Sequence, residues 1–300
     1  MPQTRTSHRA CTIGDLPRAT HWQLRTRQLT FGRLPLLMGI VNVTPDSFSD
    51  GGRYLDVDAA VRHGLELVAQ GADILDIGGE STRPYASPVD VQEELKRVSE
   101  VVRRLCLETD LPISIDTSKA EVAELALHHG AEIVNDVTGL EGDPAMIELV
   151  ASTGTGVCVM HMQGTPATMQ DQPTYDDVVE DISVYLEQRR DHLEQRGVTR
   201  GQICLDPGIG FGKTHTHNLE LLMHCDRYHE LCCPLLIGHS RKGFIGKVLT
   251  DKEVDPVYGT VGVSLALAQR GVQILRVHDV AAVRQALRLF AAAGGLDRRS

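Results

Sequence analysis

Eight short apolar segments of the chain each end in residues that can bind a ligand or take part in catalysis. The first, "LLMGIVNV", passes directly into the polar, glycine-rich stretch "TPDSFSDGG". A simple turn needs far fewer polar groups. Along the chain, the eight polar ends are Asn42, 78–83, Asp116, Asn135 with Asp136, His161, Asp206, 240–242 and 276–279. If the segments are parallel strands of one barrel, these side chains surround a common pocket.

Two carboxylates and an amide stand at three of these ends. Asp116 and Asp206 follow the third and sixth segments, and Asn135 lies between them. Such a set suits a planar, donor-rich heterocycle, because a carboxylate binds an N–C–NH₂ edge through two hydrogen bonds. The alternative is that each aspartate caps the following helix. This alternative stays open for Asp116, which precedes "TSKAEV", whereas the "DPG" sequence at Asp206 is less typical of a cap.

Basic side chains gather near the same ends. They are Arg83, Arg241, Lys242, Arg276 and His278. A group of positive charges suits an anionic leaving group or a carboxylate. The alternative is a solvated rim in which these residues pair with Asp46, Asp136 and Asp279.

The glycine-rich stretch "PGIGFGKT" is not a nucleotide phosphate loop. That motif requires a glycine five positions before Gly212, where this chain has Pro207, and we expect no strong helix start after it. Its glycines more plausibly let the backbone approach a flat ligand beside Phe211. Met160 could pack against the same ligand.

The histidines of "THTH" and "MHM" raise the question of zinc. Barrels that use zinc in hydrolysis usually begin with a histidine pair on the first strand, but that strand ends here in Asn42. A Mg²⁺ ion that bridges Asn42 and a diphosphate fits better, because Mg²⁺ prefers oxygen ligands and substrate phosphates.

Helical periodicity fills the intervals between the apolar segments. In "DVQEELKRVSEVVRRLC", Asp90 and Glu93 predict a capping box. One face of that helix carries Val91, Leu95, Val98, Val102 and Leu105. The stretch "YDDVVEDISVYLEQRRDHLEQRG" ends with Gly197 just beyond its last turn. This alternation predicts a (β/α)₈ barrel, with a doubly wound open sheet as the alternative.

Composition excludes several classes of protein. The chain has 300 residues and a net charge of -10, which argues against nonspecific nucleic-acid binding. Its seven cysteines lack zinc or redox spacing, so we expect reduced thiols in a cytoplasmic protein. No segment resembles a signal peptide or a membrane span. We expect a flexible tail over 1–20, a hairpin at "HWQLRTRQLTFG" and a single domain over 21–295.

Eight longer motifs along the chain follow the order of a known family. They are "MGIVNVTPDSFSDGG", "ILDIGGESTRP", "ISIDTSK", "IVNDV", "VCVMHMQGTPATMQ", "CLDPGIGFGK", "LLIGHSRKG" and "ILRVHDV". In kind and order they resemble the dihydropteroate synthase family from about Met38 to Val280. The resemblance implies a (β/α)₈ barrel in which 6-hydroxymethyl-7,8-dihydropterin diphosphate and 4-aminobenzoate give 7,8-dihydropteroate and diphosphate. It also implies Mg²⁺, competitive binding of sulfonamides and a homodimer.

The resemblance assigns roles to individual residues. The pterin ring would be bound by Asp116, Asn135, Asp206 and Lys242, in a slot lined by Met160, Phe211 and Gly238. Asn42, Arg276 and His278 would bind diphosphate and Mg²⁺, with Asn42 as the metal ligand. The aminobenzoate pocket would be shaped by Phe48, Thr82, Arg83 and Pro84, with Ser240 near the carboxylate. Asp46, Asp116 and Lys242 would be catalytic.

Two positions depart from the family pattern. His239 replaces a small or apolar residue, and Pro256 stands where an arginine is common; we expect effects on packing or on a dimer contact rather than on chemistry.

Two other functions remain open. A pterin-binding methyltransferase would share the ring pocket but would not need "GGESTRP" or "RVHDV". A noncatalytic pterin-binding paralogue is the alternative from another class.

Overall fold

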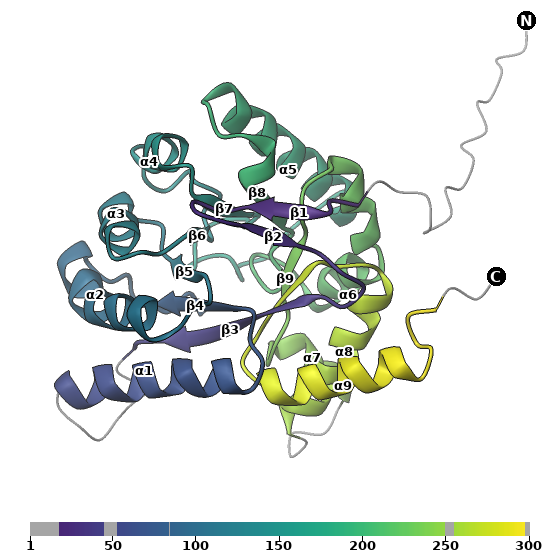
Figure 1. The fold of residues 1–300 in the computed structure, drawn as a ribbon. Helices are drawn as coiled ribbons and strands as arrows, with labels where there is room; N and C mark the ends of the chain where they lie inside the picture. The colour runs from purple at the N-terminus through teal and green to yellow at the C-terminus, as the bar shows by residue number, and fades with distance from the viewer. Residues whose placement is uncertain (1–17, 45–52, 84, 250–254, 298–300) are drawn as a thin grey trace, which may run out of the picture.

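A central barrel of parallel strands organises the molecule (Figure 1). The computed structural model describes residues 18–44, 53–83, 85–249 and 255–297. The barrel strands are β3 (Leu36–Asn42), β4 (Ile74–Gly78), β5 (Ile113–Asp116), β6 (Ile133–Asp136), β7 (Gly156–Met160), β8 (Ile203–Asp206), β9 (Leu236–Gly238) and β10 (Ile274–Val277). They pair in the order β8-β7-β6-β5-β4-β3-β10-β9, and a bridge between Leu205 and Leu235 links the two ends. The predicted barrel is confirmed, and the open-sheet alternative is wrong.

Helices surround the strands on the outside of the barrel (Figure 1). They are α1 (Arg53–Ala69), α2 (Val91–Glu108), α3 (Ala120–His128), α4 (Met146–Thr153), α5 (Val178–Gln195), α6 (His215–Met223), α7 (Gly243–Leu249), α8 (Pro256–Gln269) and α9 (Val280–Ala292). Two 3₁₀ helices, η2 (Arg200–Gln202) and η3 (Cys225–Leu231), lie before β8 and β9. Because helices cover the sheet, the strands are almost continuously apolar, as expected for parallel strands.

The signal predicted for the end of α5 is present, and α2 shows the Asp90 half of the predicted capping box, while the Glu93 side chain pairs with Arg97. The Asp90 side chain accepts a hydrogen bond from the Glu93 amide at 3.0 Å and caps α2. The inner face of α2 buries Val98 and Leu105. After α5, Gly197 has a φ of +93°, a left-handed conformation that glycine adopts without strain.

The predicted hairpin covers one end of the barrel. Strands β1 (His21–Gln23) and β2 (Gln28–Thr30) pair antiparallel. Trp22 is fully buried and its Nε1 donates to the Gln202 carbonyl at 2.7 Å. It packs with Leu24 against Ile74, Ile133 and other residues near the amino ends of the strands. The hairpin therefore closes the end opposite the polar strand ends.

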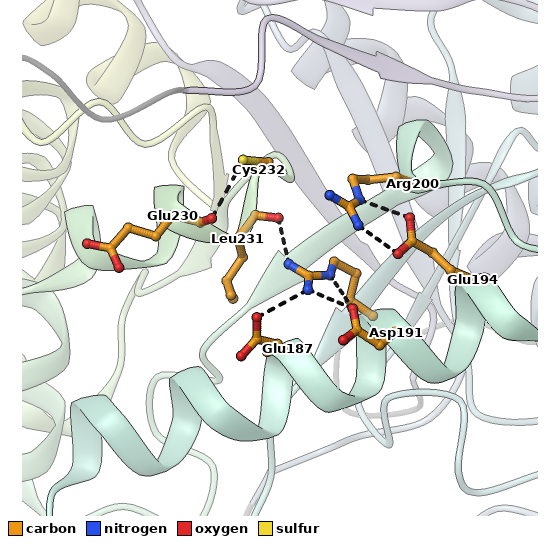
Figure 2. Close-up of polar contacts among 8 residues, drawn as sticks. Glu187, Asp191, Glu194, Arg200, Glu230, Leu231 and Cys232 are labelled. Carbon is orange, nitrogen blue, oxygen red and sulfur yellow. Dashed lines mark hydrogen bonds and ion pairs between the residues drawn. The ribbon is translucent and has the colours of Figure 1, made fainter.

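Buried arginine contacts fix the segment that precedes β9. The Arg190 guanidinium donates to the Leu231 carbonyl at 3.0 Å and to Asp191 at 2.6 Å. Figure 2 draws this group together with the more exposed Arg200–Glu194 pair. Arg190 thus joins α5 to the end of η3, immediately before the chain enters β9.

Within the described ranges, none of the helices has the length and apolar character needed to cross a membrane. The six cysteines in those ranges are free thiols.

Candidate active site

A cleft of about 690 Å³ opens at the carboxyl ends of the strands. The barrel brings residues from distant parts of the sequence to this cleft. Its lining includes the following predicted residues: Asn42, Thr82, Arg83, Asp116, Phe211, Ser240, Lys242, Arg276 and His278. Asp46, Phe48 and Pro84 lie outside the described residues. The structure therefore gathers most of the described candidates at one end of the barrel.

The other predicted residues lie deeper. Asn135, Met160 and Asp206 are buried at the ends of their strands, and Gly238 is half-buried beside Arg276. Met160 and Asp206 are paired in register on β7 and β8. These residues belong to the floor rather than to the open wall of the cleft.

Arg276 lies between two carboxylates in this floor. Its Nε approaches Asp76 Oδ2 at 2.5 Å and its Nη2 approaches Asp116 Oδ2 at 2.7 Å. The Asn135 amide also donates to Asp76 Oδ2 at 3.1 Å. Asp76 is fully buried, and its Oδ1 has no hydrogen-bond partner among the described residues.

Sequence reasoning missed Asp76. Its signal was a charged residue in the middle of the otherwise apolar strand "ILDIG". A buried charged group without full pairing is costly and therefore marks a site where a ligand can supply the missing contact.

Asp116 is not a helix cap, so that alternative is wrong. Helix α3 begins at Ala120 with Lys119 at its N-cap, and the Ala120 amide donates to Asp143 instead. Burial raises the pKa of Asp116 to about 7, although the nearby Arg276 acts in the opposite direction. The Asp116 carboxyl is thus poised between its two protonation states near neutral pH.

Asp206 and Lys242 flank the loop after β8. Asp206 Oδ1 accepts a hydrogen bond from the Gly208 amide at 2.7 Å, and burial raises the Asp206 pKa. Burial lowers the pKa of Lys242 to about 8, and its Nζ lies 4.4 Å from the centre of the Phe211 ring. Gly208 has a φ of +71°, and a Cβ there would lie 2.0 Å from the His161 carbonyl oxygen. This turn therefore requires glycine.

The charge expected on the rim needs correction. Burial lowers the pKa of His278 to about 4, so its imidazole is neutral at pH 7 in the empty cleft. Ser240 Oγ accepts from the His278 amide at 3.2 Å and lies 3.0 Å from its Nδ1. If Ser240 donates to Nδ1, the proton of the neutral ring is on Nε2, which remains a donor. Arg241 pairs with Asp279 at 2.5 Å, which confirms the salt-bridged alternative for that residue.

The loop that resembles a phosphate site has another structure. Lys213 is buried, and its Nζ donates to the Phe211 carbonyl at 2.8 Å and lies 3.0 Å from His161 Nδ1. Lys213 joins two loops and was not among the predicted site residues. The expectation of a weak helix start was wrong, because Thr214 and His217 form a capping box at α6.

The two departures from the family pattern have structural explanations. His239 is fully buried, and its Nε2 lies 2.9 Å from Ser264 Oγ and 3.1 Å from the Thr260 carbonyl oxygen. It therefore joins the end of β9 to α8. Pro256 occupies the first turn of α8, where a missing amide hydrogen costs little.

Comparisons with known proteins agree on one family. Residues 38–278 match the family described as pterin binding enzyme. The dihydropteroate synthase of Escherichia coli (strain K12) is 44% identical over 258 residues, which are 86% of this chain and 91% of the relative.

Solved structures give the same result. A Xanthomonas albilineans dihydropteroate synthase with 4-aminobenzoic acid has 46% identity and a TM-score of 0.85, covering 92% of this chain and 98% of that chain. A Yersinia pestis dihydropteroate synthase in a sulfonamide drug complex has 42% identity and a TM-score of 0.84, covering 92% and 99% of the two chains.

Proposed function

The chain belongs to the pterin binding enzyme family, and from this premise we infer that it is a dihydropteroate synthase. It is a transferase of folate biosynthesis that condenses 6-hydroxymethyl-7,8-dihydropterin diphosphate with 4-aminobenzoate. The products are 7,8-dihydropteroate and diphosphate. The observation that carries this conclusion is the close likeness to dihydropteroate synthases over nearly the whole barrel.

The floor of the cleft is the proposed pterin site. Asp116, Asn135 and Asp206 offer acceptors to the amino and ring N–H groups of the pterin, and Lys242 offers a donor to its carbonyl oxygen. Met160, Phe211 and Gly238 would line the slot for the ring. Asn135, Met160 and Asp206 are buried and the other four residues are half-buried, which supports the proposal because hydrogen bonds to charged groups strengthen where water is excluded.

The diphosphate would lie against Arg276 and His278, which both line the cleft. Arg276 supplies a permanent charge, and the neutral His278 supplies a donor whose pKa would rise beside an anion. Asn42 lines the same cleft, and its amide oxygen is a ligand type that fits Mg²⁺ together with phosphate oxygens and water. Mg²⁺ bound there would neutralise charge on the leaving diphosphate.

We propose a dissociative substitution. As the C–O bond to diphosphate breaks, the pterin methylene carbon becomes cation-like, and the Asp116 carboxylate stabilises it, with Asp46 proposed as a second anion. Lys242 balances the charge of the floor. The amine of 4-aminobenzoate is already neutral at pH 7, so its lone pair attacks that carbon without a strong base. The proton lost from nitrogen then passes to solvent or to the departing diphosphate.

The wall beside the loop after β4 is the proposed aminobenzoate pocket. Thr82, Arg83 and Ser240 all line the cleft. Phe48 and Pro84 complete the proposed pocket. The aminobenzoate and sulfonamide ligands named for the two solved relatives support this use of the cleft, with sulfonamides competing for the second substrate.

We also propose a cytoplasmic homodimer. Tyr258 and Val248 are large apolar side chains that are 71% and 53% exposed on α8 and α7, which pack together. A second copy would cover them. Sedimentation should show a dimer, and Tyr258→Glu with Val248→Glu should shift it toward monomer; a monomeric wild type would overturn the proposal.

The free thiols of the described cysteines support the proposed location in a reducing compartment, the cytoplasm.

The decisive test measures diphosphate release and dihydropteroate formation with both substrates and with each omitted. Both products should require both substrates. Binding of the pterin without turnover would favour a noncatalytic paralogue, and methyl transfer would favour the methyltransferase alternative.

A second test concerns the metal. A chelator should abolish turnover and Mg²⁺ should restore it. Full activity in metal-free enzyme, or rescue by zinc alone, would contradict the Asn42 assignment.

A further inference from the structure

The loop after β4 is closed by a hydrogen bond between its second residue, Glu80, and Val89. Glu80 Oε1 accepts a hydrogen bond from the Val89 amide at 2.9 Å. The chain between these residues includes Thr82 and Arg83, which line the cleft. The Glu80–Val89 hydrogen bond therefore holds the two ends of this loop segment together. A displacement of the Glu80 carboxylate would move Thr82 and Arg83.

Lys119 fixes the position of Glu80. Its Nζ binds Glu80 Oε2 and also approaches Glu94 Oε2 at 2.6 Å. The Glu94 side chain is fully buried in α2, whereas those of Lys119 and Glu80 are 19% and 20% exposed. Burial acts to lower the pKa of Lys119, but its hydrogen bonds to the two carboxylates prevail and the pKa is raised. Lys119 therefore remains an ammonium group at neutral pH.

The backbone of Lys119 is anchored on the pterin side of the site. It is the N-cap residue of α3, three positions after Asp116. Its amide donates to Thr117 Oγ1 at 3.2 Å, and the Thr117 amide donates to the Asn135 carbonyl at 3.0 Å. Lys119 thus links the end of β5 and its pterin residues to the loop that carries the second wall.

A separate contact fixes the start of the loop. Arg97 Nη1 donates to the Gly79 carbonyl at 2.9 Å, and Gly79 lies so close to α2 that an added Cβ would be 2.7 Å from Val98. Loss of Lys119 would therefore leave the backbone at Gly79 in place. The direct effect would be on the Glu80 carboxylate and on its hydrogen bond to the Val89 amide.

We propose that Lys119 is a positioning residue that builds the aminobenzoate pocket through Glu80. This inference rests on the proposed function, since it assigns the second substrate to Thr82 and Arg83. Lys119 acts through Glu80, which lines the cleft, and is not itself one of the described lining residues. Its loss should weaken binding of 4-aminobenzoate and leave the pterin floor unchanged.

The test uses steady-state kinetics with each substrate varied in turn. Lys119→Met should raise the KM for 4-aminobenzoate about tenfold or more, the scale of one lost charge-assisted hydrogen bond. The KM for pterin diphosphate should stay within about twofold, a change of well under one such bond. Glu80→Gln should act in the same direction, because it keeps an acceptor for Val89 but removes the charge paired with Lys119. Lys119→Arg should restore most of the affinity.

A matched control separates this effect from general loss of charge. Lys96→Met removes a lysine of α2 that is 47% exposed and lies 3.6 Å from Glu93, so neither KM should change. Lys119→Met also leaves the buried Glu94 without its cation, which can destabilise the fold. The double variant Lys119→Met with Glu94→Gln relieves that problem, and circular dichroism would confirm folding.

The outcomes separate the two proposals. An unchanged KM for 4-aminobenzoate in the folded double variant, or equal increases for both substrates, would overturn the role of Lys119. If Lys119→Met does not fold, the double variant and Glu80→Gln decide in the same way. A wild-type enzyme that forms no dihydropteroate would instead overturn the proposed function itself.

Discussion

Asp76, Asp116 and Asp206 place three carboxyl groups around Arg276 and Lys242. Burial penalises each negative charge in the empty protein, and it raises the pKa of both Asp116 and Asp206. The same low polarity increases the attraction between a carboxylate and a developing cation. The features that make the empty floor costly would thus favour charge separation in a pterin bound at the proposed site.

Pterin diphosphate should release protons when it binds near pH 7. The free Asp116 has a pKa of about 7, and donors of the pterin favour its ionised form, so its pKa falls in the complex. Affinity should therefore rise with pH toward about 7 and then level off. Calorimetry in buffers of different ionisation enthalpy measures the released protons. Asp116→Asn should reduce the release; unchanged release in that variant would exclude Asp116 as its source.

Removal of the Asp206 charge should weaken pterin binding while the fold persists. Asp206→Ala loses a charge-assisted contact worth ~1.5–3 kcal/mol, so the affinity for pterin diphosphate should fall roughly tenfold or more. Asp206→Asn is the companion variant, because its amide oxygen can still accept from Gly208, the 2.7 Å contact of the wild type. Calorimetric affinities equal to wild type in both variants would reject the assignment.

Sequence predicted the residues at strand ends better than residues whose role depends on neighbours distant in sequence. Asp116 and Asp206 stand at strand ends, where the barrel makes their convergence a geometric necessity. Asp76 and Lys213 depend on which neighbours approach them in space, and periodicity does not supply that information. The neutral state of His278 also depends on burial, which residue type alone does not give.

At the scale of elements, the strand runs and helix caps were predictable because they arise from local sequence. Asp90 and Gly197 act within one turn of their helix ends. Closure of the barrel depends instead on contacts between β8 and the segment before β9, which are distant in sequence. The connection from α5 to η3 through Arg190 is of this second kind.

That connection should contribute measurable stability. Arg190→Met leaves the Leu231 carbonyl without its buried donor, so the free energy of unfolding should fall by ~1–3 kcal/mol. The paired control is Arg200→Met, since Arg200 is 47% exposed and bonds Glu194 at the surface (Figure 2). Its loss should cost ~0–1 kcal/mol. Equal losses in urea unfolding would show that the Arg190 contact has no special role.

At the scale of the whole molecule, the two substrate sites differ in how they are built. Most of the proposed pterin residues stand on strand ends, whereas the proposed second wall comes from the loop closed by Glu80, with Phe48 and Pro84. The sequences "TPDSFSDGGR" and "GESTRPYASP" contain few residues that could form a core of their own. We therefore expect binding of the pterin diphosphate to complete the aminobenzoate pocket.

Binding should consequently follow an order. 4-Aminobenzoate and sulfonamides should bind weakly to the empty enzyme and tightly after pterin diphosphate, or after diphosphate with the pterin cation. Calorimetric titration of a sulfonamide with and without the first substrate measures the difference. Hydrogen exchange in the two loops should slow in the ternary complex but not with aminobenzoate alone. Tight sulfonamide binding to the ligand-free protein would overturn this order.

The hairpin beneath the barrel gives the molecule a built-in optical probe. Trp22 is the single tryptophan of the chain, and it is fully buried at the end of the barrel opposite the cleft. Its fluorescence should shift to longer wavelength when unfolding exposes the indole to water. Because the cleft lies at the other end, occupation by either substrate should leave that emission nearly constant. Intrinsic fluorescence can therefore follow the integrity of the barrel in every variant while the ligands are present.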